Sequence, residues 1–159
     1  MSEEHKVIPG TISFSYDSFI KLLESLVNNF DSAGESMIFQ LGRDYGVYYC
    51  QDVLTKLPSN EMELQDLFEY VIQVASKDGW ANMELDEFNP QNGSIHVILK
   101  QNVFQPKCTM LHSPQCFFLR GYISGIIKEL TNIDYMFFSS QCYAQGDEHC
   151  SIKMIAQVR

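Results

Sequence analysis

The stretch Ser139–Ile152, SSQCYAQGDEHCSI, places two cysteines on either side of a short polar segment. The polar segment reads as a tight turn, and the residues around it predict a β-hairpin with strands over about 133–143 and 149–157. In such a hairpin Cys142 lies nearly opposite Cys150, with Cβ atoms about 4.5–5.5 Å apart. Two thiolates at that separation can bind one metal ion, each at roughly 2.3 Å.

A third cysteine precedes this hairpin. Ser113 and Pro114 form an N-cap followed by proline, which predicts a helix running to about Leu130. Cys116 then lies in the first helical turn, where the positive end of the helix dipole favours an anionic sulfur. The spacing leaves two alternatives open: a metal site, or three thiols packed in the core, because free cysteine is often buried.

The rest of the chain predicts an α+β fold with helices packed on an antiparallel sheet of two hairpins, in the order ααα-ββ-α-ββ. Apolar residues recur at helical spacing in three segments, and two segments alternate with period two around the turn sequence NPQNG. The predicted helices run from the N-cap Ser15 to the DSAG stretch, over Ser36–Leu57, and from Asn60, with Glu63 completing a capping box, to the KDG stretch. The predicted strands are 80–88 and 94–104.

The length and composition limit the number of domains and the kinds of partner that the protein can have. A chain of 159 residues, 45% of them hydrophobic, suits one domain spanning 1–159. Only 19% of residues are charged, so we expect part of the surface to be covered, in a dimer or around a cavity. The net charge of −9 and the lack of a basic run exclude nucleic acid as the main partner.

The N-terminal sequence and the cysteine count indicate the compartment. The first ten residues lack the apolar core of a signal peptide, and no stretch is apolar for the ~18 residues of a membrane span. We therefore expect a cytoplasmic protein. Five cysteines in a reducing compartment argue against a disulfide framework and favour metal binding.

The last third of the chain resembles the 4-vinyl reductase domain family. That family's pattern is a cysteine, a helix with Gly-aromatic-x-x-Gly, a strand, and then Cys-x-x-x-Gly-Asp-x-x-Cys. The matching residues here are Cys116, Gly121, Tyr122, Gly125, Cys142, Gly146, Asp147 and Cys150. The family includes a bacteriochlorophyll-pathway protein and aromatic-responsive sensor domains of bacterial activators, and it is similar to small subunits of a Golgi trafficking complex that hold an acyl chain.

The resemblance implies a zinc ion held by Cys116, Cys142 and Cys150. Family sensors add a glutamate three residues before the middle cysteine, where this chain has Ser139, a poor zinc ligand. His112 is our first choice for the fourth ligand. The alternatives are water, Cys108 or His149, or loss of the metal from the site.

The resemblance also implies an apolar cavity for an aromatic small molecule or a lipid. Its candidate lining residues are Trp80, Phe104, Tyr122, Tyr135 and Phe137, for which core packing is the alternative. The motifs Gly42-x-x-x-Gly46 and Gly121-x-x-x-Gly125 predict close helix approach, and with the low charged fraction they favour a homodimer.

The sequence thus predicts a small-molecule-binding regulatory domain with a structural zinc site, acting on a partner or a downstream signalling domain. The alternatives are an accessory protein of tetrapyrrole vinyl reduction and an adaptor subunit that holds a lipid. No nucleophile, phosphate-binding or metalloprotease motif is visible, so an enzyme is the less favoured class.

Overall fold

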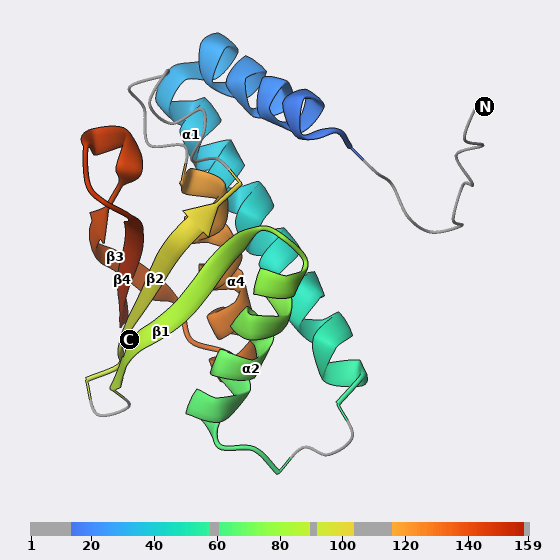
Figure 1. Cartoon of the computed structure of the whole chain (residues 1–159), viewed down its shortest axis with the longest axis vertical. Coiled ribbons are helices and arrows are strands. Elements are labelled where there is room, and N and C mark those ends of the chain that lie inside the picture. Colours follow the sequence, from blue (N-terminus) through green and yellow to red (C-terminus); the bar gives the residue numbers. More distant parts are fainter. Residues whose placement is uncertain (1–13, 58–60, 90–91, 104–115, 158–159) are drawn as a thin grey trace, which may run out of the picture.

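The computed structural model describes residues 14–57, 61–89, 92–103 and 116–157, which form a helical layer packed on one four-stranded sheet (Figure 1). Phe104, Cys108, His112, Ser113 and Pro114 lie outside the described residues. In chain order the elements are α1 Tyr16–Thr55, α2 Leu64–Lys77, β1 Ala81–Asn89, β2 Ser94–Asn102, α4 Phe117–Thr131, β3 Tyr135–Gln141, the short 3-10 helix η1 Tyr143–Gln145, and β4 Cys150–Ala156.

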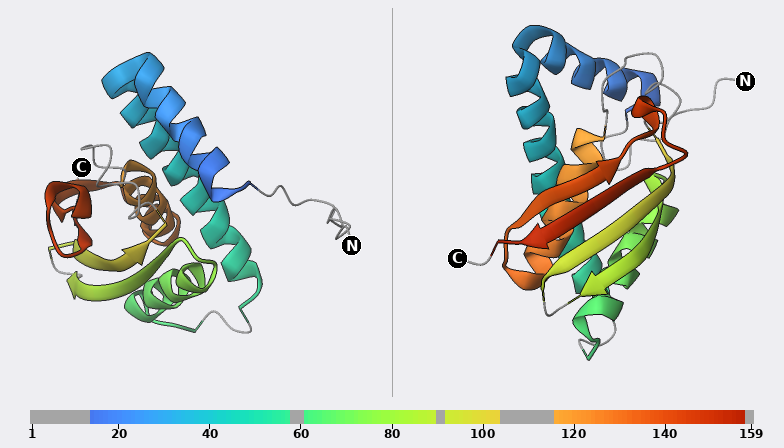
Figure 2. Two further views of the ribbon diagram at one scale, coloured as in Figure 1. Left: turned by 45° about the horizontal axis from the view of Figure 1, so that its top comes forward. Right: turned by 90° about the vertical axis from the view of Figure 1, so that its left-hand side faces the viewer.

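The sheet has the strand order β1-β2-β4-β3, and every neighbouring pair is antiparallel. The two hairpins predicted from sequence are confirmed, and pairing between β2 and β4 joins them into one sheet. The helices cover one face, and the other face is seen uncovered in Figure 2. Alternation along each strand sends apolar residues toward the helices, as in Ile95, Val97 and Leu99 of β2, all of which are buried.

Helix α1 contains a break at Asp31, where the backbone has φ 47° and ψ −126°. The two helices predicted over this region therefore meet at Asp31 and point in different directions (Figure 1). The predicted N-cap at Ser15 is confirmed, because its hydroxyl accepts a hydrogen bond from the Ser18 amide at 3.2 Å. Helix α2 begins later than predicted: Glu63 is its N-cap and makes no side-chain capping bond.

The second half of α1 and α4 pack through their glycines. A Cβ atom added at Gly42 or Gly46 would overlap the backbone of α4, and one added at Gly121 or Gly125 would overlap the backbone of α1. Each Gly-x-x-x-Gly pair therefore receives the other helix of the same chain. The predicted close approach of helices is confirmed, but these glycines are not available to pair two chains.

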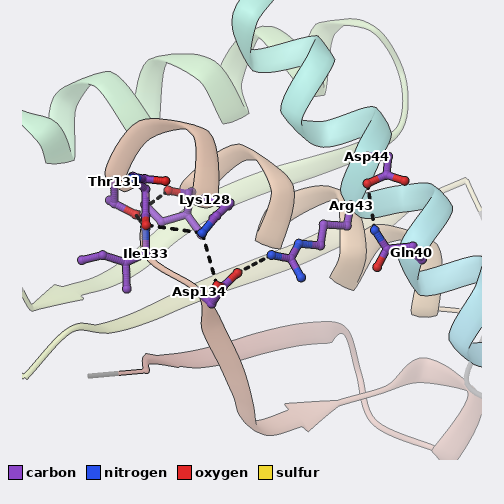
Figure 3. A network of polar contacts seen from close by, with 9 residues as sticks. Gln40, Arg43, Asp44, Lys128, Thr131, Ile133 and Asp134 are labelled. Carbon is purple, nitrogen blue, oxygen red and sulfur yellow. Dashed lines mark hydrogen bonds and ion pairs between the residues drawn. The ribbon is translucent and has the colours of Figure 1, made fainter. Parts of the chain in front are cut away.

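A polar network ties the start of β3 to this helix pair (Figure 3). Arg43 of α1 donates to one carboxylate oxygen of Asp134, and Lys128 of α4 donates to the other at 3.2 Å. The Lys128 hydrogen bond and the nearby Arg43 charge hold the pKa of Asp134 below its usual range. Because these groups are about 30% exposed, solvent screens them, and we attribute to them a role in orientation more than in stability.

None of the helices in the described residues combines the length and the apolar character needed to cross a membrane.

Candidate functional site

Three cysteine sulfurs meet at one end of the sheet. The Sγ atom of Cys116 lies 3.7 Å from that of Cys142 and 3.4 Å from that of Cys150. All three side chains are at most 1% exposed. The structure therefore brings together the three residues that the sequence selected as metal ligands.

Each cysteine stands at the end of an element. Cys116 is the N-cap residue of α4, directly before the first turn in which the sequence reading placed it, and Cys142 caps η1 directly after β3. Cys150 opens β4. The turn between the last two is held by Asp147, whose carboxylate accepts the Cys142 amide at 2.7 Å, and by Gly146 at φ 96°, a value that disfavours residues with a Cβ.

The spacing of the sulfurs fits a tetrahedral zinc ion. Zinc–sulfur bonds of about 2.3 Å at a tetrahedral angle place two sulfurs about 3.8 Å apart. The two measured separations lie close to that value, and the ligand atoms of all three cysteines lie within 4.8 Å of one another. Bound zinc would stabilise the thiolate forms at the point where α4 meets the last hairpin.

Without a cation the Cys150 sulfur disfavours ionisation. The hydrogen bond with Cys116 lowers the pKa of Cys150, but the neighbouring Cys142 and burial outweigh it and raise that pKa to about 11. Several buried thiolates in contact would repel one another, so a positive charge is the simplest way to hold them ionised. The donor set therefore suits a soft divalent metal better than three independent thiols.

No fourth candidate ligand joins the three cysteines among the described side chains. His112 and Cys108 lie outside the described residues, as does the side chain of Ser139. His149 is described, but it is not part of the group of metal-ligating side chains that the described residues form. The choice of His112 stays a prediction.

A cluster of aromatic rings surrounds two of the predicted ligand-binding residues. Trp80 and Tyr122 have ring centroids 6.2 Å apart. Their neighbours come from the two halves of α1 and from α4, at ring centroid distances of 5.0–6.4 Å. The aromatic cluster consists of Phe19, Tyr45, Tyr49, Trp80, Phe118 and Tyr122. The sequence reading missed Tyr45, Tyr49 and Phe118, although their four-residue spacing within each helix places them on a shared face.

Tyr122 is the most deeply buried member of this aromatic cluster. Its side chain is fully buried, and within the described residues its hydroxyl makes no hydrogen bond of good geometry, although the Tyr49 hydroxyl lies close enough to raise its pKa. Tyr49 meets its ring edge-on but donates its own hydroxyl to Asp78 at 2.5 Å. Burial raises the pKa of Tyr122 well above its usual value, and Tyr49 adds to this effect, so the hydroxyl stays protonated and able to donate.

The other candidate lining residues lie elsewhere. Phe137 packs edge-on against Phe39 of α1 with centroids 5.4 Å apart, and Tyr135 lies near Thr131 at the end of α4. A pocket of about 420 Å³ lies at the far end of the helices, where none of the predicted residues contributes. It is lined by Leu54, Thr55, Leu57, Met62, Leu67, Glu129 and Leu130. A cavity bounded by Trp80, Tyr122 and Phe137 stays a prediction.

Comparisons with known proteins agree with this architecture. Residues 95–155 match the family model of the 4-vinyl reductase domain. The fold is similar to the phenol-responsive sensory domain of the transcription activator PoxR with phenol, with a TM-score of 0.77 and 15% identity over 92% of this chain and 76% of the other. No curated protein matches the chain.

Two further solved structures share the fold. One is a trafficking protein particle complex subunit 3 from Naegleria fowleri covalently bound to palmitic acid, with a TM-score of 0.68 and 14% identity over 90% of this chain and 93% of that one. The other is a vinyl-4-reductase family protein from Methanocaldococcus jannaschii, with a TM-score of 0.60 and 14% identity over 94% and 85%. The resemblance read from the cysteine and glycine motif is therefore confirmed, and residues 95–155 are the part of this chain that matches the 4-vinyl reductase domain.

Proposed function

We propose that the protein is a small-molecule-binding regulatory domain whose fold is fastened by zinc. The observation that carries the ligand-binding role is the Tyr122 hydroxyl, which is buried among aromatic rings and makes no hydrogen bond of good geometry within the described residues. A buried polar group without a hydrogen bond costs about 1–3 kcal/mol. A ligand that offers an oxygen to this hydroxyl would recover that cost on binding.

The ligand class follows from the surroundings of Tyr122. Tyr45 stacks on its ring at 5.4 Å, and Trp80 stacks on Phe118 at 5.0 Å. Tyr45 is 40% exposed, so a change in its rotamer is the simplest way to admit a ligand between these rings. An aromatic ring bearing a hydroxyl combines the stacking surface and the polar atom that this aromatic cluster accommodates. Phenol, which the PoxR sensory domain holds, is therefore the first probe.

Trp80 supplies the measurement, since it is the one tryptophan of the chain and lies within the aromatic cluster. We expect phenol to change its fluorescence in a saturable way. Replacement of Tyr122 by phenylalanine should weaken phenol binding about 10-fold, because one hydrogen bond to the ligand is lost. The same change should raise the free energy of unfolding of the ligand-free protein by about 1 kcal/mol, because it removes an unpaired buried hydroxyl.

The matched control is Tyr70→Phe, which removes a hydroxyl from an exposed position on α2. It should leave both phenol affinity and stability unchanged. Saturable binding that is equally strong in the Tyr122→Phe protein would remove Tyr122 from the site, and no saturable response to phenol would exclude this ligand class.

A lipid-holding adaptor is the second candidate, supported by the palmitic acid bound to the structurally similar trafficking subunit. The two functions differ in how the ligand is held. A sensor releases its ligand reversibly, whereas an adaptor retains a lipid through purification. Mass spectrometry under native and denaturing conditions separates them, because a stoichiometric acyl chain in the purified protein would favour the adaptor.

We also propose that the protein forms a homodimer through the second half of α1. The chain's glycine motifs are used internally, but Met37, Leu41 and Tyr48 form an exposed apolar stripe at helical spacing along this segment. Light scattering at micromolar concentration should give twice the chain mass of 18.3 kDa. Replacement of Leu41 by lysine should return the monomer mass with unchanged circular dichroism, and a monomer mass for the unaltered protein would exclude the dimer.

A further inference from the structure

Asn102 is a buried polar residue at the end of β2, close to the three cysteines. It is 7% exposed, and few other polar side chains among the described residues are as deeply buried. Burial of an amide is unfavourable unless its groups find hydrogen-bond partners. A buried asparagine at a strand end therefore points to a specific local role.

A β-bulge turns Asn102 inward. Met83 of β1 pairs with Leu99, whereas Asn82 pairs with Gln101, so β2 has one extra residue at this point. Bulges shift the alternation of side chains and commonly re-aim a residue beside a functional site. Lys100 and Gln101 are both exposed, and Asn102 is buried in their place.

The inward side chain reaches the cysteine cluster. Leu99 pairs with Cys150 across β2 and β4, which brings the end of β2 beside the first residue of β4. The Nδ2 group of Asn102 donates to the Sγ atom of Cys150 at 3.5 Å, and the backbone amide of Tyr143 donates to the same sulfur at 3.4 Å. Two N–H groups directed at one buried sulfur fix the position of that sulfur at the end of β4.

We propose that Asn102 is a positioning residue of the metal centre, whose side-chain N–H donates to the Cys150 sulfur and aims that sulfur at the ion. The inference rests on the zinc site proposed above. The side-chain N–H of Asn102 donates a hydrogen bond to one of the three sulfurs that would surround the ion. Partners of this kind orient ligands in protein metal centres, and their loss typically lowers metal affinity 10- to 100-fold.

The test compares metal affinity in three variants of the whole chain. Asn102→Leu keeps the volume and removes the N–H donor, and Asn102→Asp keeps the shape but replaces the donor with a carboxylate. The control is Ser94→Ala, at the opposite end of β2, where the buried hydroxyl bonds to Glu87 at 2.6 Å, away from the cysteines. Zinc affinity is measured by competition with a chromophoric chelator. Substitution with cobalt(II) reports thiolate ligation through its sulfur-to-metal charge-transfer band.

We expect zinc affinity to fall about 10- to 100-fold in both Asn102 variants, with a shifted charge-transfer band and unchanged circular dichroism. Ser94→Ala should match the unaltered protein in both measurements. If the unaltered protein binds zinc stoichiometrically and Asn102→Leu binds it as tightly with the same band, the inference is wrong while the zinc site stands. Tighter binding by Asn102→Asp would also overturn it, since that result indicates ligation by oxygen. Lack of metal binding by the unaltered protein overturns the site and the inference together.

Discussion

Replacing Gly121 by alanine should destabilise the protein by about 3 kcal/mol, and replacing it by leucine should prevent folding. A Cβ atom at this position would overlap the carbonyl oxygen of Phe39 and come within 2.8 Å of the Arg43 backbone nitrogen. Both neighbours are backbone atoms of α1, which cannot rotate away as a side chain would. The helices would have to separate, and the contacts along their whole length would weaken.

Urea unfolding followed by circular dichroism measures this effect. Helix propensity acts in the opposite direction, since alanine is favoured over glycine by about 1 kcal/mol in a helix. The pair Gln51→Ala and Gln51→Gly reports that propensity alone, because Gln51 is an exposed helical residue of α1 well away from the break at Asp31. If Gly121→Ala proves as stable as the unaltered protein, the close contact between α1 and α4 is not as described.

Replacing Cys150 by serine should abolish zinc-dependent stabilisation, which we expect to reach about 4 kcal/mol when free zinc exceeds its dissociation constant 1,000-fold. Serine oxygen is a weak zinc ligand, and Cys150 is the sulfur on which Asn102, Tyr143 and Cys116 converge. The measurement is the melting temperature with excess zinc and with chelator. The unaltered protein should shift between the two conditions, and the Cys150→Ser protein should not.

Cys50→Ala provides the matched control. Cys50 is also fully buried, and burial raises its pKa to about 12, but it lies apart from the group formed by the other three. Its removal can lower stability through lost packing while leaving the zinc-dependent shift intact. If the zinc-dependent shift in melting temperature persists in Cys150→Ser, or is missing from the unaltered protein, the three cysteines are packed thiols and not a zinc site.

Local patterns were sufficient to predict the elements and the meeting of the cysteines. Turn chemistry around Gly146 and the spacing of Cys142 and Cys150 define the last hairpin, because hairpin register depends mainly on the turn. The paired glycines correctly indicated a backbone at close range. They could not show whether that backbone belongs to the same chain or to a second copy, because helix packing within a chain and between chains uses the same small residues.

Features that depend on long-range packing were not predictable in the same way. The family resemblance named Phe137 as a cavity-lining residue, but its contact with Phe39 depends on how α1 crosses the sheet. Asn102 was missed because a bulge reverses the alternation at the end of β2, and a bulge of this kind leaves no glycine or proline in the strand to mark it. The break at Asp31 fell near the predicted helix end because the DSAG stretch is locally unfavourable for a helix.

The pairing of α1 with α4 also has a consequence for biosynthesis. The ribosome releases α1 long before it synthesises Gly121 and Gly125 of α4. The apolar face around Gly42 and Gly46 therefore stays exposed until α4 is made. The cysteine hairpin, in contrast, forms from neighbouring residues and appears last. A nascent chain with an early helix left unburied is exposed to aggregation, so production of this protein in cells should depend on chaperones that hold α1 until α4 emerges.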